Sequence, residues 1–187
     1  MDIQKFEELE QELGTQLTIG MLDWYAISSS YHALKEDFIR KYKGCVLWEE
    51  ISKHQELSED FIREFKHAVD WKAICENQKL SEDFIREFQD RLDLKRVSYF
   101  QTLSEDFMRE FQDELDWYSI SVKQTLSEDF MREFKDKLDW RMISSYQKLS
   151  EDFISEFKDK IWLEYLKINQ NITSEIKNTF GAAVVLK

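Results

Sequence analysis

Pairs of carboxylates recur in this chain at a step of 23 residues, and carboxylates are among the side chains that acid–base catalysis uses. The pairs are Glu59-Asp60, Glu82-Asp83, Glu105-Asp106, Glu128-Asp129 and Glu151-Asp152. Catalysis needs a constellation set apart from its surroundings, whereas these pairs all belong to the repeat. Each pair directly follows a serine, so the pattern predicts negative charge placed at the positive end of a helix dipole.

An acidic surface that mimics nucleic acid is the alternative role for such carboxylates. Stacked helices lie roughly 8–10 Å apart, so the net charge of −12 spread over the repeats gives about one charge per 5 Å. Duplex DNA presents one charge per about 1.7 Å. Mimicry is therefore expected only in a local acidic patch. The candidates for such a patch are Glu7, Glu8, Glu10 and Glu12, or Asp113, Glu114 and Asp116.

The other residues that could do chemistry form no recognisable site. The three histidines lack the spacing of metal ligands, and the two cysteines occupy unrelated positions of the repeat. These residues are His32, His54, His67, Cys45 and Cys75. The sequence contains no Gly-rich phosphate loop and no nucleophile paired with a base. We therefore expect no enzyme, no cofactor and no metal.

The overall charge and composition limit the partners and the location of the chain. A net charge of −12 argues against direct binding to nucleic acid or to an anionic membrane. No apolar run of about 18 residues is present, so no membrane-spanning helix is expected. Two cysteines are too few for a disulfide framework, which favours a reducing compartment and a cytoplasmic location.

A single period explains where all these residues stand. Leucine or isoleucine recurs every 23 residues, at Leu34, Leu57, Leu80, Leu103, Leu126, Leu149 and Ile172. A constant step of this size is typical of a chain built by stacking one small unit. We predict an all-α fold, an α-solenoid of about six tandem two-helix repeats with capping ends. Residues 1–33 and 172–187 would form the caps and 34–171 the repeats, in one continuous domain.

Each repeat is predicted to contain two short helices, here called helix A and helix B. In the repeat at residues 103–125, Ser104 would cap helix A, which should span about 11 residues. Its buried stripe would consist of Phe107, Phe111 and Leu115. Arg109 and Asp113 are expected to pair across one turn on the opposite side. Asp116 would then cap helix B, which spans roughly 8 residues and depends on packing against its neighbours.

Three positions of helix B are predicted to face the interior or the next repeat. A glutamine ladder, capping carbonyls or bridging repeats, would consist of Gln55, Gln78, Gln101, Gln124, Gln147 and Gln170. Small residues would let neighbouring helices approach closely at Ser52, Cys75, Ser98, Ser121 and Ser144. Core aromatic residues are expected at Trp48, Trp71, Trp117 and Trp140.

The two ends depart from the repeat, as the caps of a solenoid do. Residues 3–13 are predicted to form a helix that Gly14 stops. Near the other end Trp162-Leu163 replaces the usual Asp-Trp pair, and Thr173 is predicted to cap a last helix. The apolar tail at residues 182–186 is expected to cover the final repeat or to anchor a partner.

The motif Leu-Ser-Glu-Asp-Phe-Ile-Arg-Glu-Phe, followed by Asp-Trp-x-x-Ile-Ser-x-Tyr-Gln, resembles a short repeat of uncharacterised proteins from large DNA viruses and bacteriophages. The likeness covers residues 34–171. It implies no catalytic residues. It does imply a virus-encoded protein that acts on a host component, and the expected location would then be the cytoplasm of the host cell.

The outer positions of helix B change from repeat to repeat, whereas helix A keeps nearly the same charges. Exposed aromatic and apolar side chains among charges are typical of a binding hot spot, although ordinary surface drift is the alternative explanation. The predicted partner-binding residues are Tyr99, Phe100, Tyr118, Val122, Arg141, Met142 and Tyr146.

These patterns predict a non-enzymatic, protein-binding helical repeat scaffold. The expected partner is a host protein, such as a defence nuclease or a nucleic-acid-binding complex, which the chain would inhibit. The alternative function is an acidic mimic that competes with DNA or RNA for a nucleic-acid-binding protein. Self-association through the open ends of the solenoid is a third option.

Overall fold

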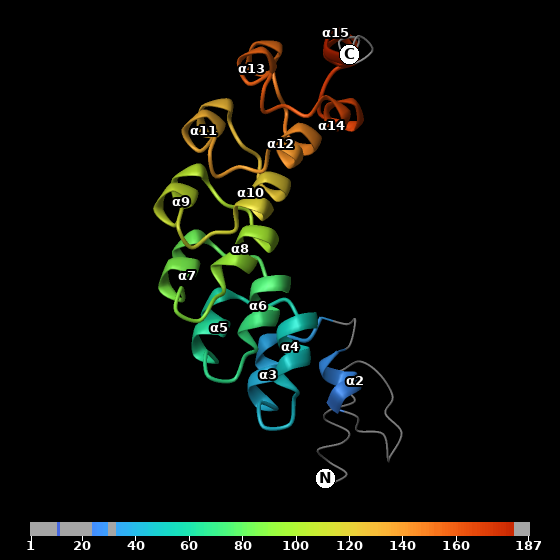
Figure 1. Cartoon of the computed structure of the whole chain (residues 1–187). Coiled ribbons are helices and arrows are strands. Elements are labelled where there is room, and N and C mark those ends of the chain that lie inside the picture. The colour runs from blue at the N-terminus through green and yellow to red at the C-terminus, as the bar shows by residue number, and fades with distance from the viewer. Residues whose placement is uncertain (1–10, 12–23, 30–32, 182–187) are drawn as a thin grey trace. The chain divides into compact units, whose positions relative to one another are not determined.

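The computed structural model describes residue 11, residues 24–29 and residues 33–181, and across these the regular secondary structure consists of α-helices joined by turns. It confirms the prediction of an α-solenoid built from tandem two-helix repeats (Figure 1). The chain divides into two compact units, unit 1 at residues 1–92 and unit 2 at residues 93–187. The expectation of one continuous domain stays a prediction, and we describe each unit by itself.

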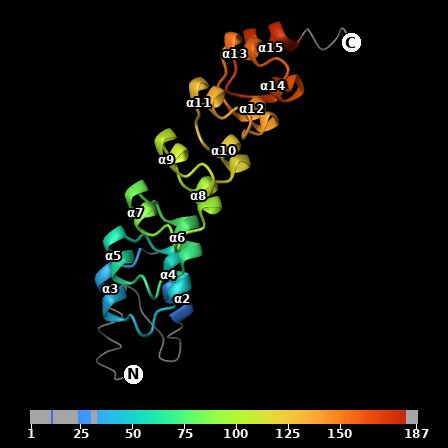
Figure 2. The ribbon, with the colours of Figure 1, turned by 60° about the vertical axis from the view of Figure 1, so that its left-hand side comes forward.

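Unit 1 contains six helices that the structure describes. They are α2 (Trp24–Ser28), α3 (Glu36–Lys41), α4 (Trp48–His54), α5 (Glu59–Glu64), α6 (Trp71–Asn77) and α7 (Glu82–Glu87). The even-numbered helices are the helix B elements and lie in one row, while the odd-numbered helix A elements lie in a second row (Figure 2). Helix α4 packs between α2 and α6, so neighbouring repeats of this unit share their contacts.

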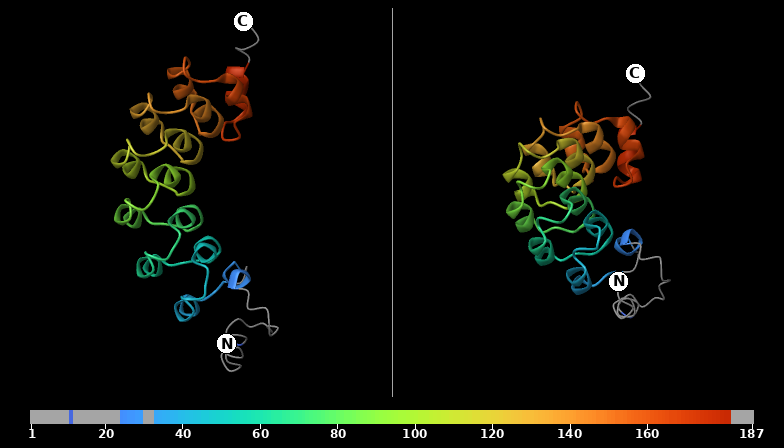
Figure 3. Two further views of the ribbon diagram at one scale, coloured as in Figure 1. Left: turned by 60° about the horizontal axis from the view of Figure 1, so that its bottom comes forward. Right: turned by 90° about the horizontal axis from the view of Figure 1, so that it is seen from below.

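Unit 2 contains the remaining eight helices. They are α8 (Leu94–Phe100), α9 (Glu105–Glu110), α10 (Trp117–Lys123), α11 (Glu128–Glu133), α12 (Trp140–Tyr146), α13 (Glu151–Glu156), α14 (Leu163–Ile168) and α15 (Ser174–Gly181). Within this unit α8, α10 and α12 form the row of helix B elements, and α9, α11 and α13 form the row of helix A elements (Figure 3). Successive members of the helix B row, from α8 to α14, contact one another.

Serine and aspartate caps begin the helices where the sequence predicts them. The Ser104 hydroxyl accepts the N–H of Phe107 at the start of α9, and the Asp116 carboxylate accepts the N–H of Ser119 at the start of α10. Equivalent serines cap α5, α7, α11 and α13. Such caps satisfy N–H groups that have no partner inside the helix, so they fix where each short helix starts.

Helix A is shorter than the sequence suggested, since it spans six residues rather than about 11. At its end Phe111 leaves the helical region, with φ −106° and ψ 26°. The N–H groups of Glu114 and Leu115 both donate to the Phe111 carbonyl, which closes a tight turn. Phe107, Phe111 and Leu115 are nevertheless all buried, because the turn carries Leu115 back into the core.

The core repeats one aromatic cluster. The first phenylalanine of each regular helix A is fully buried: Phe61, Phe84, Phe107, Phe130 and Phe153. The predicted core tryptophans are half-buried and stack across the boundary between repeats, as Trp117 does on Phe134 with 4.9 Å between the ring centroids. Its indole N–H donates to the Gln112 carbonyl at 2.9 Å. Packing across boundaries explains how helices too short to persist alone are stable here.

The C-terminal end begins as predicted, with the Thr173 hydroxyl accepting the N–H of Ile176 at the start of α15. In this helix Lys177 stands where the regular helix A elements bury isoleucine or methionine, which gives the last helix a more polar face. The predicted helix at residues 3–13, its stop at Gly14 and the tail at residues 182–186 lie outside the described residues.

Candidate interaction surface

The inner side of helix B carries the predicted glutamine ladder. In unit 1 the Gln78 amide accepts the N–H of Leu57 at 3.0 Å and donates to the carbonyls of Ser52 and Gln55 at 3.0 and 2.7 Å. In unit 2 the Gln124 amide makes the same three bonds, to Leu103, Ser98 and Gln101. Each buried amide therefore joins the backbones of two repeats, which confirms its bridging role.

The prediction that Gln170 belongs to this ladder is wrong, because Gln170 is exposed and the buried Asn169 takes its place. The Asn169 amide donates to the carbonyls of Ser144 and Gln147 at 2.8 and 2.9 Å. Helix α14 has six residues where the other regular helix B elements have seven, so the ladder position falls one residue earlier. The shorter asparagine side chain fits this earlier position.

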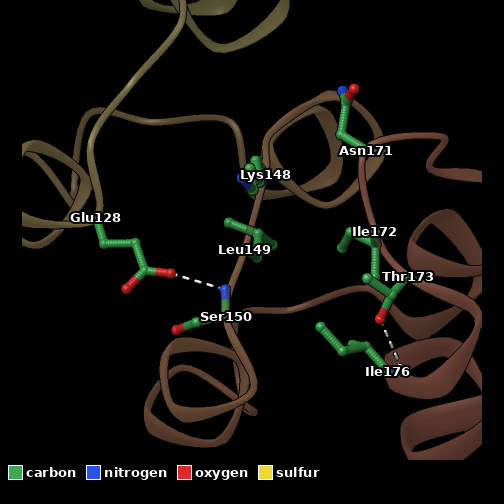
Figure 4. A pocket seen from close by; sticks show the side chains of 8 residues that line it. All are labelled: Glu128, Lys148, Leu149, Ser150, Asn171, Ile172, Thr173 and Ile176. Carbon is green, nitrogen blue, oxygen red and sulfur yellow. Dashed lines mark hydrogen bonds between the residues drawn. The ribbon is translucent and has the colours of Figure 1, made fainter.

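A hollow lies between the last two repeats, beside Leu149 and Ile172 (Figure 4). In the preceding repeat the N–H of Leu126 donates to Gln147, whereas the N–H of Leu149 has no hydrogen-bond partner among the residues that the structure describes. The hollow measures about 300 Å³, and Ile172 and Ile176 line its far wall. It collects no set of titratable groups that could carry out a reaction.

The small residue of helix B is a hydrogen-bonding residue rather than only a spacer. The Ser98 hydroxyl accepts the N–H of Asp116 in the next repeat at 3.0 Å and donates to the Leu94 carbonyl at 2.8 Å. Ser121 makes the same pair of bonds, to the N–H of Asp139 and to the Trp117 carbonyl. The serine row thus positions the cap residue of each following helix B.

The recurring carboxylates of helix A also join neighbouring repeats. The Glu105 carboxylate accepts the N–H of Ser127, 22 residues later, at 2.7 Å. The Arg109 guanidinium pairs with Asp106 at 3.0 Å and with Glu133 of the next repeat at 2.9 Å. The hydrogen bond that Arg109 donates to the Glu133 carboxylate raises the pKa of Arg109 above its ordinary value. These first-turn carboxylates therefore have structural roles. They lie at the positive ends of the helices, and they bond to neighbouring groups of the chain.

The predicted pair between Arg109 and Asp113 is wrong. Arg109 turns toward its own first turn and the next repeat, while Asp113 pairs with Lys137 at 3.0 Å. Asp116 caps α10 and also accepts the hydroxyl of Ser119. Of this candidate acidic patch, Glu114 alone has no ion pair or side-chain hydrogen bond to a described residue. The other candidate patch, Glu7, Glu8, Glu10 and Glu12, lies outside the described residues.

The predicted partner-binding residues all lie on the outer side of three neighbouring helices of unit 2. Tyr99 and Phe100 belong to α8, Tyr118 and Val122 to α10, and Arg141, Met142 and Tyr146 to α12. The four aromatic side chains are between 43% and 52% exposed, and Val122 and Met142 are half-buried. We call this set of seven residues the helix B surface of unit 2.

Several contacts connect this surface into one patch. The Tyr99 and Phe100 rings meet edge to face at 4.9 Å, and the Lys123 ammonium lies 4.3 Å above the Tyr99 ring. The hydrogen bond that Arg141 donates to the Asp139 carboxylate raises the pKa of Arg141, and the Tyr165 and Tyr118 phenols add smaller contributions in the same direction. Aromatic faces attract cations, so contacts of this kind stabilise the position of Lys123 over the Tyr99 ring.

Sequence reasoning missed two further exposed residues at α14, the next helix of the row. Trp162, 49% exposed, takes the cap position of α14 without a side-chain cap bond, and Ile168, 69% exposed, stands near the end of that helix. Tyr146 and Ile168 both line a hollow of about 370 Å³. The departure from the Asp-Trp pattern at residues 162–163 was the available signal, because it removes the usual cap and core residues from their places.

Seven of the eight matching positions of unit 1 are polar. They hold Glu49, Glu50, Lys53 and His54 on α4, and Lys72, Glu76 and Asn77 on α6. The eighth position, which matches Met142, holds the buried Ala73. Glu50 and Glu76 are half-buried, and the other five polar residues are exposed. None of the large apolar side chains exposed in unit 1 belongs to these outer positions among the residues that the structure describes, since Tyr25 lies on α2 and Leu47 caps α4.

No alternative site of another kind appears in the part of the chain that the structure describes. No group of three or more His, Cys, Asp or Glu residues there is placed to hold a metal ion. No helix there has the length and apolar character needed to cross a membrane. Comparison with known proteins gives no match to a family, a curated protein or a solved structure.

Proposed function

We propose that this chain is a non-enzymatic protein-binding scaffold whose contact face is the helix B surface of unit 2. The observation that carries the proposal is the grouping of four half-exposed aromatic rings on three adjacent helices. Single exposed apolar residues are common on any protein and need no explanation. Grouped tyrosine, phenylalanine and arginine residues are the composition of protein-interface hot spots.

The interior of the repeats supports this role, because it holds the surface in one shape. The Gln124 amide, the Ser98 hydroxyl and the Glu105 carboxylate each bond the backbone of a neighbouring repeat. Helices α8, α10 and α12 are therefore fixed relative to one another within unit 2. A surface that is ordered before binding loses less conformational entropy when a partner docks.

The resemblance of the repeat to viral and phage proteins supports a host protein as the partner. In this proposal the chain occupies that protein and inhibits it, and a defence nuclease is one candidate. Binding of this kind requires no catalysed reaction. The repeats supply rows of equivalent residues rather than the unique constellation that catalysis needs.

Affinity capture from host lysate tests the proposal with two matched double variants. Tyr118→Ala with Met142→Ala removes two contacts of the surface, and Lys53→Ala with Lys72→Ala changes matching outer positions of unit 1. We expect the first variant to lower partner recovery by about tenfold or more, because hot-spot truncations cost over 1 kcal/mol each. The second should leave recovery unchanged. Equal recovery by all three proteins would remove this surface from consideration.

A further inference from the structure

The three helices that carry the helix B surface of unit 2 are basic, although the chain is acidic overall. Helices α8, α10 and α12 contain four cations, Lys95, Arg96, Lys123 and Arg141, and no Asp or Glu. The chain as a whole carries a net charge of −12. In unit 1, by contrast, α4 and α6 contain three glutamates and two lysines.

An aspartate precedes each of these three helices, and each of these aspartates is engaged in capping. Asp93 accepts the N–H of Lys95, Asp116 that of Ser119, and Asp139 those of Arg141 and Met142. Asp93 also pairs with Arg96, and Asp139 pairs with Arg141. Lys95 and Lys123 are the exposed cations of these three helices that form no ion pair with a described residue.

We propose that this surface recognises an acidic peptide segment that also carries apolar side chains. The inference rests on the proposed function and names the chemistry of the partner. The apolar side chains of the segment would pack on Tyr118, Val122 and Tyr146. Its carboxylates would pair with Lys95 and Lys123, whose charges have no competing carboxylate. Complementary charge of this kind selects partners and orients them, while the aromatic contacts supply most of the affinity.

A nucleic acid is the other polyanion that aromatic rings and cations could hold, since bases stack on exposed rings. The charge of the whole chain argues against it. A strand of nucleic acid extends beyond a patch with four cations, and the surrounding protein would repel its further phosphates. An acidic peptide segment of a few residues fits within the patch and avoids this repulsion.

Selection from a displayed library of random 12-residue peptides tests the inference on the full-length protein. We expect Asp and Glu to exceed Lys and Arg by about threefold or more among the selected peptides. Lys95→Glu with Lys123→Glu should abolish or reverse this preference. The matched control Lys53→Glu with Lys72→Glu should retain it. Fluorescence anisotropy with a 12-nucleotide thymidine strand forms the nucleic-acid arm, and we expect no binding there.

The outcomes separate this inference from the proposed function. Tyr118→Ala with Tyr146→Ala should remove the selected peptides altogether. If selection depends on these tyrosines but shows no acidic preference, the proposed function stands and the inference fails. If selection ignores these tyrosines, the proposed function fails as well. An empty selection, or a thymidine strand that binds and is released by Lys95→Glu with Lys123→Glu, would overturn the acidic-peptide inference.

Discussion

The helix B elements of the two units share one interior and differ on the outside. Gln78 in unit 1 and Gln124 in unit 2 make the same three bonds to the preceding repeat. The second residue of each helix faces outward, however, and it is Lys72 in α6 and Tyr118 in α10. Positions that bond to neighbouring repeats stay constant, whereas positions that face outward vary freely.

This difference indicates that the outer residues of a repeat protein, rather than the inner ones, carry its function. Inner residues are restricted by buried hydrogen bonds whose loss is expensive, so their constancy reports stability. Outer residues face no such restriction, so a group of aromatic rings there needs another cause than folding. Four experiments, ordered by the size of the expected effect, test this separation of inner and outer roles.

The largest effect is expected inside the ladder. Gln78→Ala and Gln124→Ala should each lower the free energy of unfolding by about 3 kcal/mol, because each leaves a buried N–H and two buried carbonyls without their partner. Urea unfolding measures both. The two losses should agree within about 1 kcal/mol although the surfaces above them differ. A large loss at one site only would contradict a shared interior.

An exchange of outer residues should affect binding and leave stability alone. Tyr118→Lys with Tyr146→Asn gives α10 and α12 the residues that α6 carries at the same positions. We expect partner affinity to fall by about 2 kcal/mol, while the free energy of unfolding changes by less than about 0.5 kcal/mol. Titration and urea unfolding of one protein preparation measure both quantities. Marked destabilisation would show that these rings serve the fold.

The cap of α12 is expected to be worth about 1 kcal/mol at neutral pH, as measured by the loss on Asp139→Ala. Burial raises the pKa of Asp139, but hydrogen bonds from the Arg141 side chain and from the N–H groups of Met142 and Arg141 outweigh it and hold the pKa below its ordinary value. A lowered pKa means that this stabilisation is complete above the unfolded-state value and disappears as the pH falls through the folded-state value.

The difference between the wild type and Asp139→Ala should therefore shrink in acid, as urea unfolding at neutral pH and near pH 2 would show. Asp70→Ala removes the matching cap from α6 in unit 1, where the carboxylate accepts the N–H of Ala73 at 2.7 Å. At neutral pH it should cost the same. A difference that persists unchanged in strong acid would show that the Asp139 carboxylate is not the group responsible.

The smallest effect is a gain of stability in unit 1. Leu47 occupies the cap position of α4 with φ −89° and ψ 106°, close to the −87° and 106° of Asp116, but it offers no side-chain acceptor. Leu47→Asp should stabilise the protein by about 0.5 kcal/mol, less than a full cap because Glu49 and Glu50 repel it. Loss of stability in thermal unfolding would mean that the packing of the half-exposed leucine stabilises the protein more than an aspartate cap does.

Much of this fold could be predicted from the sequence because one period governs both the helices and their contacts. The cap serines, the glutamine ladder at Gln78 and Gln124 and the buried stripe of helix A follow from residue type and position within the repeat. The outer aromatic residues could be placed as well, since Tyr118 and Tyr146 fall off the buried stripe.

The remaining features depend on geometry that residue spacing does not contain. The ion pair between Arg109 and Glu133 joins residues 24 apart, so it appears only when two repeats are stacked. Asn169 replaces Gln170 because α14 is one residue shorter, which changes the register after the last regular repeat. Helix A ends at Phe111 because a turn begins there, although the apolar stripe continues to Leu115.

Site-specific photo-crosslinking tests most directly whether the outer surface of unit 2, and not that of unit 1, binds a partner. A photoreactive phenylalanine analogue would replace Tyr118 in one protein and Lys72, at the same outer position of unit 1, in another. Both proteins would be irradiated in host lysate. We expect a crosslinked host protein from position 118 and none from position 72. Equal crosslinking from both positions, or crosslinking from position 72 alone, would contradict this expectation.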